Sequence, residues 1–434
     1  MAKALFRPET VLDGDLAVTL AGVPEGYKAQ VLAEIAEAAA RNDRAGLVYA
    51  ASDGQQLASI QSALSFHAPR LEVIELPAWD CLPYDRVSPS SEVIARRIAT
   101  LGRLAGMADG KRVGAPLLVL TTANALMQRN APRDFMSTQV LHLAPGNRIH
   151  MDKLAHWLAG NGFERTSTVR ERGEFAVRGG IVDLFAPGDD EPLRLDFFGD
   201  TLESIRSFDA ASQRTTGQLK ELSLAPMSEL TLDEASISRF RTGYISAFGA
   251  ATRDDALYQA VSEGRKFAGT EHWLPLFFER LDTSFDYFAG FHIVVDYHTS
   301  DAIAERFRHV TDYYEARKHA VDTALDAGAP YKPIEPHALY MTPDEVRARL
   351  DAIQATVLSP FVPPENSATR VIDLGGKPGR SFAAERAAGA NVFEAVVNHA
   401  ADCRERGMKV VIAAWSEGTR DRLKQVLGEH HMDR

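Results

Sequence analysis

The sequence is poor in cysteine. Its two cysteines, Cys81 and Cys403, cannot build a disulfide framework, and no Cys-x-x-Cys pair is present that could bind zinc. The paired His430 and His431 lie beside Glu429 in a segment typical of a frayed C-terminal tail, so we expect no metal site there. This cysteine usage is typical of a protein of the reducing cytoplasm.

Long apolar runs are also missing. The uncharged stretch Val113–Gln128 is too short to cross a bilayer, and it contains threonine, asparagine and glutamine. The first residues of the chain lack the hydrophobic run of a secretory signal. We therefore expect no membrane association and a cytoplasmic location.

Positive charge is in deficit. The chain has 48 basic and 59 acidic residues, a formal net charge of −11. This balance argues against a general electrostatic grip on DNA, although a local basic site is still open. With 434 residues, 45% of them hydrophobic and 25% charged, the chain is long enough for roughly three globular domains.

Strand and helix patterns alternate in the first part of the chain. Gly46–Ala51 and Leu117–Thr121 are continuous apolar runs that predict buried strands. Apolar residues recur at helical spacing in residues 27–40, 53–66 and 90–106. This order predicts a parallel sheet that is covered by helices.

The pattern then changes. From Glu174 to Asp209 apolar residues alternate with period two between tight turns, which predicts an antiparallel meander and a separate small α/β domain. Residues 226–357 are mixed and include a long helix at 301–326, and the proline-rich Leu358–Pro364 predicts a linker. After it we expect strands and helices at Arg370–Leu374, Asn391–Arg406, Lys409–Ala414 and Ser416–Leu427.

One loop has the context of a phosphate-binding loop, between an apolar strand and a helix. The working pattern G-x-x-x-x-G-K-[ST] needs its second glycine for close approach to phosphate and its hydroxyl for magnesium. Gly22 and Lys28 match, whereas Tyr27 (preceded by Gly26) replaces the second glycine and Ala29 replaces the hydroxyl residue. Without a metal ligand, phosphoryl transfer lacks its charge neutraliser. We favour a strand-to-helix turn in an inactive relative over ATP hydrolysis.

Period-two alternation in the meander assigns its side chains to two faces. The buried face receives Leu193, Leu195 and Phe197. Arg178, Arg194 and Phe198 then point outward, and an exposed phenylalanine flanked by arginines is typical of a protein-binding hot spot. Phosphate binding is a rival, but residues 151–225 hold 13 acidic and 9 basic side chains, which would repel nucleic acid. A solvated sheet face is the other alternative.

Long segments of the chain resemble the N-terminal region of the bacterial transcription-repair coupling factor (Mfd) family. They occur in the family's order and extend over about residues 15–300, with weaker similarity to the end. The segments are Leu76–Pro89, Ile94–Leu101, Gly173–Phe185, Arg194–Asp200, Ile205–Asp209, Ser212–Thr215 and Gly269–Phe278.

This region of the family is similar to the nucleotide excision repair protein UvrB. The resemblance implies an α/β multidomain fold: a degenerate RecA-like parallel-sheet domain, interrupted by a small α/β domain with an antiparallel sheet, and the start of a further α/β domain. The implied boundaries are 1–138 for domain 1A, 139–225 for domain 2, 226–357 for domain 1B, 358–366 for a linker and 367–434 for part of domain 3.

Besides its degenerate phosphate loop, the chain differs from UvrB at a second place. UvrB follows its Tyr-Asp motif with a tyrosine-rich β-hairpin that clamps damaged DNA. Here Tyr84 and Asp85 run through Ser88–Glu92 directly into a helix, which leaves no room for a hairpin. The resemblance therefore implies UvrB-like architecture without ATPase activity or damage clamping.

The resemblance also implies a partner. In the family, domain 2 recruits UvrA through two arginines and a phenylalanine of its sheet, and the motifs align these with Arg178, Arg194 and Phe198. They are the residues that the alternation places outside. Arg206 is a candidate peripheral contact, with ordinary surface charge as the equal alternative.

Family members are much longer than this chain. The resemblance implies a later RNA-polymerase-binding domain, an ATP-driven DNA translocase motor and a C-terminal domain that masks domain 2 at rest. We expect a fragment that binds UvrA, with RNA polymerase, DNA, ATP and magnesium bound only by the absent domains. The alternatives are a stand-alone UvrA-binding scaffold and a UvrB-like damage-verification helicase, which Tyr27, Ala29 and the missing hairpin disfavour.

Overall fold

The structure is a computed structural model that describes residues 6–12, 16–107, 115–186, 189–251, 255–323, 331–364, 369–414 and 416–432. The chain divides into two compact units, Met1–Gly376 and Lys377–Arg434, and each is described by itself.

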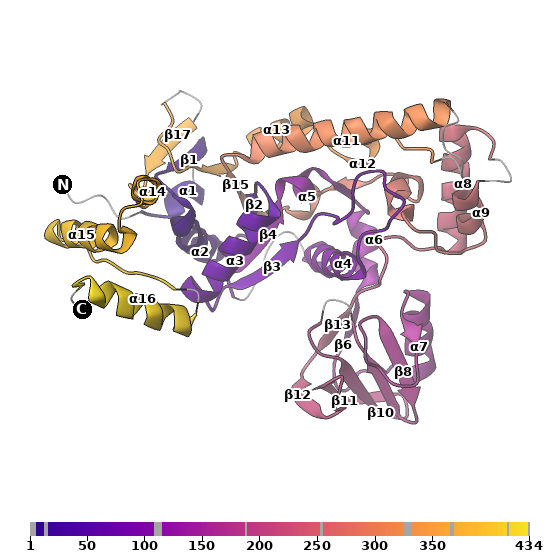
Figure 1. The fold of residues 1–434 in the computed structure, drawn as a ribbon. Helices are drawn as coiled ribbons and strands as arrows, with labels where there is room; N and C mark the ends of the chain where they lie inside the picture. The colour runs from indigo at the N-terminus through magenta and orange to yellow at the C-terminus, as the bar shows by residue number, and fades with distance from the viewer. Residues whose placement is uncertain are drawn as a thin grey trace. The chain divides into compact units, whose positions relative to one another are not determined.

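A seven-stranded parallel sheet is the centre of the first unit (Figure 1). Its strands lie in the order β17-β1-β16-β15-β2-β4-β3, and each pairs in parallel with its neighbours. The strands are β1 (Ala17–Ala21), β2 (Gly46–Ala51), β3 (Glu72–Leu76), β4 (Leu117–Thr122), β15 (Phe291–Asp296), β16 (Thr356–Leu358) and β17 (Thr369–Asp373).

Both faces of this sheet are buried, which explains the continuous apolar runs. Val48 of β2 belongs to one apolar cluster and Tyr49 to the other. The cluster around Tyr49 is covered by α2 (Glu25–Arg41) and α3 (Gly54–His67), and the cluster around Val48 by α4 (Ser91–Gly106) and α11 (Thr299–Asp322).

Short polar side chains fix where two of these helices begin. The Asp53 side chain accepts a hydrogen bond from the backbone of Gln56 at the start of α3, and Ser90 does the same for α4. α2 differs, because Pro24 precedes it without a capping side chain and Glu25 lies in its first turn. An acidic side chain at this helix start opposes the approach of an anion.

A second sheet forms the body of residues 164–219, with strand order β12-β11-β10-β9-β8-β7. Its strands are β7 (Glu164–Arg165), β8 (Glu174–Arg178), β9 (Ile181–Leu184), β10 (Leu193–Phe198), β11 (Thr201–Phe208) and β12 (Thr215–Leu219). All neighbours are antiparallel except β7 and β8. Helix α7 (Met151–Gly160) packs Leu154 and Leu158 into the apolar cluster on one face. The meander expected from the sequence is present, and the α/β multidomain class is confirmed.

The small sheet connects to the rest of its unit through a pair of antiparallel strands, β6 (Leu141–Leu143) and β13 (Leu222–Leu224). The remaining elements of the first unit are α1 (Glu9–Leu12), α5 (Ala123–Met127), β5 (Arg129–Asn130), α6 (Arg133–Gln139), α8 (Glu234–Phe248), α9 (Ala256–Ser262), η2 (Thr270–Leu276), β14 (Asp282–Thr283), α10 (Ser284–Tyr287), α12 (Pro336–Leu339) and α13 (Pro343–Ala352).

The end of the chain differs from the sequence-based expectation. β17, expected in the last unit, pairs along its whole length with β1, so it extends the first sheet. In the second unit, α14 (Ala383–Ala387), α15 (Val392–Glu405) and α16 (Glu417–Glu429) form, but Lys409–Ala414 is not a strand. A strand needs a hydrogen-bonded neighbour, and the described residues of this unit form no other strand. Residues 365–368, which span the end of the expected linker and the start of the expected domain 3, lie outside the described residues, and the expected domain boundaries stay predictions.

Across the described part of the chain, no helix has the length and apolarity that crossing a membrane requires.

Candidate partner-binding face and a closed phosphate loop

The small sheet has an outer face opposite α7, and Arg178, Arg194 and Phe198 lie on it. Buried and accessible side chains alternate along β10, as the period-two pattern predicted. Phe198, at the end of β10, is 77% exposed. Ala176 lies on the same face, because period-two alternation along β8 places it with Arg178, and it is buried in a small apolar cluster with Val169, Phe185 and Phe208. The outer face is therefore partly apolar beneath its charged side chains.

The two arginines share one carboxylate. Arg178 donates a hydrogen bond from Nη2 to Oδ2 of Asp183 at 2.5 Å. Arg194 donates from Nε to Oδ1 at 2.7 Å and from Nη2 to Oδ2 at 2.9 Å. Asp183 is in register with Arg194 on the neighbouring strand and is fully buried. The hydrogen bond with Asp183 raises the pKa of Arg194 above its ordinary value, although burial opposes the shift.

The arginines differ in accessibility. The side chain of Arg178 is 49% exposed and that of Arg194 is 17% exposed. The Arg194 guanidinium also stacks on the ring of Phe208, with its carbon 4.6 Å from the ring centroid. Arg194 is therefore fixed from two sides, whereas Arg178 keeps half of its surface available.

Arg206 belongs to a separate pair on the same face. It donates to both oxygens of Asp196 at 2.9 and 2.7 Å, and Ser204 donates to Oδ2 of the same carboxylate. Burial alone would raise the pKa of Asp196, but the hydrogen bonds from Arg206 and Ser204 lower it. The structure thus places all four candidate residues on one face, with Arg206 already neutralised.

The lysine of the phosphate loop forms ion pairs within the protein. Lys28 is 2% exposed, and its Nζ lies 2.6 Å from Oδ2 of Asp296 and 2.7 Å from Oε2 of Glu25. Gln56 and the hydroxyl of Tyr49 also donate to Asp296, at 3.3 and 3.4 Å. Burial, with the charge of Asp296 next, raises the pKa of Tyr49 well above its ordinary value.

The loop itself is covered by backbone. Leu374, just after β17, donates from its backbone nitrogen to the carbonyl of Ala21 at 2.9 Å. A Cβ atom added to Gly376 would lie 2.5 Å from the carbonyl oxygen of Gly22 and 2.9 Å from Cδ of Pro24, so this segment lies directly on the loop. Gly22 has a φ of +64° that favours glycine. Tyr27 and Ala29 both belong to α2. Ala29 is buried in the apolar cluster on this side of the sheet, and Tyr27 packs against that cluster. A Cβ atom added to Gly26, in the first turn of α2, would meet no other atom within 4 Å.

A buried polar network connects the segment that follows β13 with α4 and the loop after β3, and it includes two residues of the motifs that carry the family resemblance. Glu229, just after β13, is fully buried and accepts hydrogen bonds from Arg97 Nε at 2.5 Å and Trp79 Nε1 at 3.1 Å. Arg97 also donates to the carbonyl of Pro77 and to Asn130. Their position shows that Trp79 and Arg97 support the fold.

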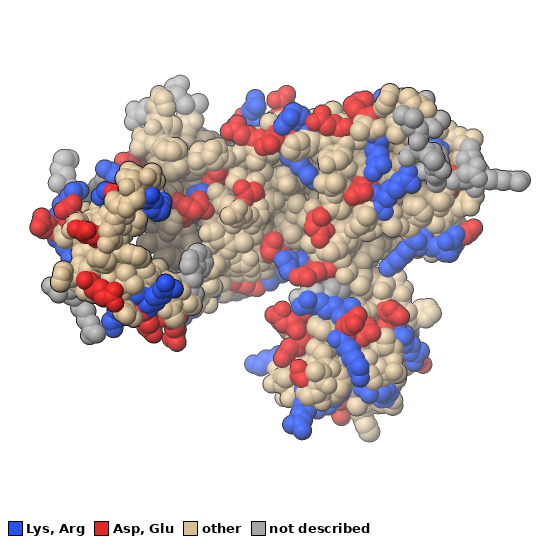
Figure 2. Space-filling view, viewed as in Figure 1, with Lys and Arg blue, Asp and Glu red and all other residues tan. Residues whose placement is uncertain are grey.

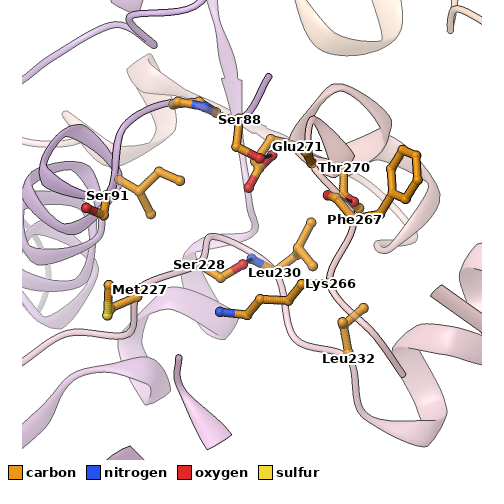
Figure 3. Close-up of a pocket in the computed structure, with 13 residues that line it drawn as sticks. Ser88, Ser91, Met227, Ser228, Leu230, Leu232, Lys266, Phe267, Thr270 and Glu271 are labelled. Atoms are coloured by element: carbon orange, nitrogen blue, oxygen red, sulfur yellow. Dashed lines mark hydrogen bonds between the residues drawn. The ribbon is translucent and has the colours of Figure 1, made fainter. Parts of the chain in front are cut away.

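A cavity of about 240 Å³ lies beside this network, between the start of α4 and the segments at 227–232 and 266–271 (Figure 3). Ser88 donates to Oε2 of Glu271 at 2.7 Å across one side of it. Burial raises the pKa of Glu271, although the hydrogen bond from Ser88 opposes the shift. No cluster of metal-ligating side chains occurs among the described residues, at this cavity or elsewhere.

Sequence reasoning missed Asp183, Asp296 and Glu229. Period-two alternation along β9 would have placed Asp183 beside the arginines, because Val182 and Leu184 occupy the core. The other two acids lie far along the chain from their partners, so no local pattern connects them. Figure 2 shows acidic and basic side chains interspersed on the visible face, and the chain as a whole carries a formal net charge of −11.

Comparison with known proteins matches the small sheet to a described family. Residues 141–230 match the UvrB interaction domain. The fold and this match define an α/β multidomain protein of UvrB-like architecture that carries such a domain.

Two proteins of similar sequence are both transcription-repair-coupling factors. The transcription-repair-coupling factor of Haemophilus influenzae is 33% identical over 354 residues, 81% of this chain. That of Escherichia coli is 34% identical over 324 residues, 74% of the chain. The chain spans 29% and 26% of the lengths of these two relatives. It is homologous to the N-terminal region of the transcription-repair-coupling factors, which confirms the resemblance drawn from its sequence.

Proposed function

We propose that this chain is the part of a transcription-repair coupling factor that recruits UvrA for nucleotide excision repair. The observation that carries the proposal is the outer face of the small sheet. There, Phe198 stands exposed on the same face as Arg178 and Arg194, within the residues that match the UvrB interaction domain.

The proposed mechanism is non-covalent docking, with no chemical reaction. Phe198 inserts into an apolar recess of UvrA and supplies most of the buried area, since large aromatic anchors dominate hot spots. The arginines, farther along the same face, add charge-assisted hydrogen bonds to acidic groups of the partner. Arg206, already paired with Asp196, contributes at the periphery.

The proposal for the parent protein follows the family. The whole protein recognises RNA polymerase stalled at a lesion, displaces it by ATP-driven translocation on DNA, and brings UvrA to the site in the cytoplasm. Binding of RNA polymerase, DNA, ATP and magnesium is assigned to other domains. This chain then needs no nucleotide at the Gly22 loop, which the Lys28–Asp296 pair and the Leu374–Gly376 backbone fill. The same features disfavour a damage-verification helicase.

Calorimetric titration of UvrA with the chain tests the proposal. The Arg178→Ala/Arg194→Ala variant should bind at least 30-fold more weakly, roughly the loss of one hot spot. A matched control is Lys153→Ala/Arg165→Ala, which removes the same charge on the α7 side of the sheet, where Arg165 is in register with Phe175. Equal affinities of the two variants would contradict docking on the outer face, and no binding by the unaltered chain would reject the proposed function.

A further inference from the structure

Asp183 is a fully buried carboxylate on the outer face of a sheet, where a charge is unexpected. On that face it lies among the apolar side chains of Ala176, Phe185 and Phe208, and a valine or leucine would extend their cluster. Transfer of a carboxylate from water into such a place carries a penalty of several kcal/mol. Ion pairs of this kind stabilise a fold no better than apolar residues of the same volume. The carboxylate therefore needs an explanation beyond stability.

The buried carboxylate is explained by the two arginine side chains that Asp183 binds. Its two oxygens accept three hydrogen bonds from arginines on two different strands, β8 and β10. Arginine side chains have several rotatable bonds, and ordering them at an interface costs about 0.5–1.5 kcal/mol each. Asp183 orders both before any partner arrives, which lowers that cost.

We propose that Asp183 is a positioning residue of the partner-binding face, and that it gives the two arginines different roles. Arg194, held between Asp183 and the ring of Phe208, acts as a support. Arg178, bonded to Asp183 through one nitrogen and half exposed, presents the rest of its guanidinium to the partner on the same face as Phe198. The cluster of two arginines and one aspartate keeps one net positive charge, which fits an acidic group of the partner. The identity of that partner rests on the proposed function.

A double-mutant cycle on the complete chain, with UvrA in the calorimeter, separates positioning from a structural role. Asp183→Asn keeps the size of the side chain and removes its charge, and we expect it to weaken binding about tenfold. Arg178→Ala should weaken binding about 30-fold in the unaltered chain but less than about threefold in the Asp183→Asn background. Phe198→Ala should weaken binding by the same factor in both backgrounds. Asp196→Asn, on the same face but paired with Arg206, is the matched control and should leave the effect of Arg178→Ala unchanged.

A measurement without a partner completes the test. In the free chain labelled with ¹⁵N-arginine, the Nε–H proton of Arg194, bonded to Asp183 at 2.7 Å, should exchange slowly with solvent, and Asp183→Asn should abolish this protection.

The outcomes distinguish the two proposals. The positioning role is wrong if Arg178→Ala weakens UvrA binding by the same factor in both backgrounds. It is also wrong if the Nε–H proton of Arg194 stays protected from exchange in Asp183→Asn. If the unaltered chain fails to bind UvrA, the proposed function is wrong, and the exchange measurement still decides whether Asp183 holds the arginines.

Discussion

The Nζ atom of Lys28 lies 2.6 Å from Oδ2 of Asp296, and both side chains are buried. The pair joins the first turns of α2 to the end of β15, although the two residues are 268 positions apart. In a working phosphate loop the corresponding lysine binds phosphate. Here its charge is neutralised inside the protein, so the lysine is a structural cation.

Replacing this lysine should destabilise the large sheet. Lys28→Met keeps the length of the side chain but leaves Asp296 as a buried charge without a cation, held by the backbone N–H of His298 at 3.0 Å and by the weak Tyr49 and Gln56 contacts. Breaking a buried pair in this way typically costs about 3–5 kcal/mol. Urea unfolding at pH 7 measures the loss, with Lys153→Met on the surface of α7 as the control. A loss as small as that of the control would mean that the pair does not hold these elements together.

The closed loop also predicts that ATP does not bind there. A ligand at a hundredfold excess over its dissociation constant stabilises the folded state by about 2.7 kcal/mol. We expect no rise of the melting temperature with millimolar ATP and magnesium beyond that seen with sodium phosphate at equal ionic strength. A rise that Lys28→Met removes would contradict the closed loop.

Local patterns in the sequence predicted most of the elements that position the site. Buried parallel strands such as Gly46–Ala51 are continuous apolar runs, and the alternation in β10 assigned Phe197 and Phe198 to opposite faces. Both patterns arise because burial acts on each residue of a strand separately. The alternation left a binding role for the outer face open beside a solvated face, the family resemblance favoured the binding role, and it stays a prediction.

Pairings between distant segments could not be predicted in this way. β17 joins β1 because that strand offers an unpaired edge, and nothing within Thr369–Asp373 specifies this neighbour. Lys409–Ala414 has the composition of a strand but finds no partner among the described residues of its unit. The partners of Lys28 and Arg97 likewise depend on the completed fold.

Loss of Glu229 should loosen the contact of the segment that follows β13 with α4 and the loop after β3. Glu229→Ala leaves the fully buried Arg97 without its carboxylate, which should cost about 3–5 kcal/mol of stability. Because Glu229 anchors the segment that follows β13 to Arg97 and Trp79, limited proteolysis should also cut residues 225–232 faster. Glu234→Ala, in the exposed first turn of α8, is the control. Unchanged urea unfolding and unchanged proteolysis in Glu229→Ala would contradict the anchoring role.

Lowering the pH should reduce the free energy of unfolding through the buried His292. Burial, with the charge of Arg44 next, lowers the pKa of His292 to about 4 from its ordinary value of 6.5. Between these pH values the unfolded chain binds a proton that the folded chain does not, so stability falls as pH falls through this window. At 1.36 kcal/mol per unit, the effect approaches about 3 kcal/mol near pH 4.

The variant His292→Gln isolates this effect. Glutamine can keep the hydrogen bond to Thr356 but has no proton to gain. Urea unfolding from pH 7 to 4.5 should show a smaller loss of stability in this variant than in the unaltered chain, whereas the exposed His67→Gln should follow the unaltered chain. Burial lowers the pKa of His272 to about 4 as well, but this residue is present in all three proteins, so it cancels in the comparison. Parallel pH curves for all three proteins would contradict the assignment.

Neighbouring phenylalanines on β10 allow binding and stability to be separated. Phe198 is exposed, so Phe198→Ala should change the free energy of unfolding by no more than about 0.5 kcal/mol. If it anchors UvrA, the same change should weaken binding about 30-fold or more, the effect of a hot spot of about 2 kcal/mol. Phe197 faces the core, so Phe197→Leu should lower stability by roughly 1 kcal/mol and leave the affinity of the folded protein unchanged. Calorimetry with UvrA and urea unfolding on both variants measure the two effects. Because the two residues are adjacent, a disturbance that simply spread along β10 would affect binding in both, and only a true contact at the outer face gives opposite results.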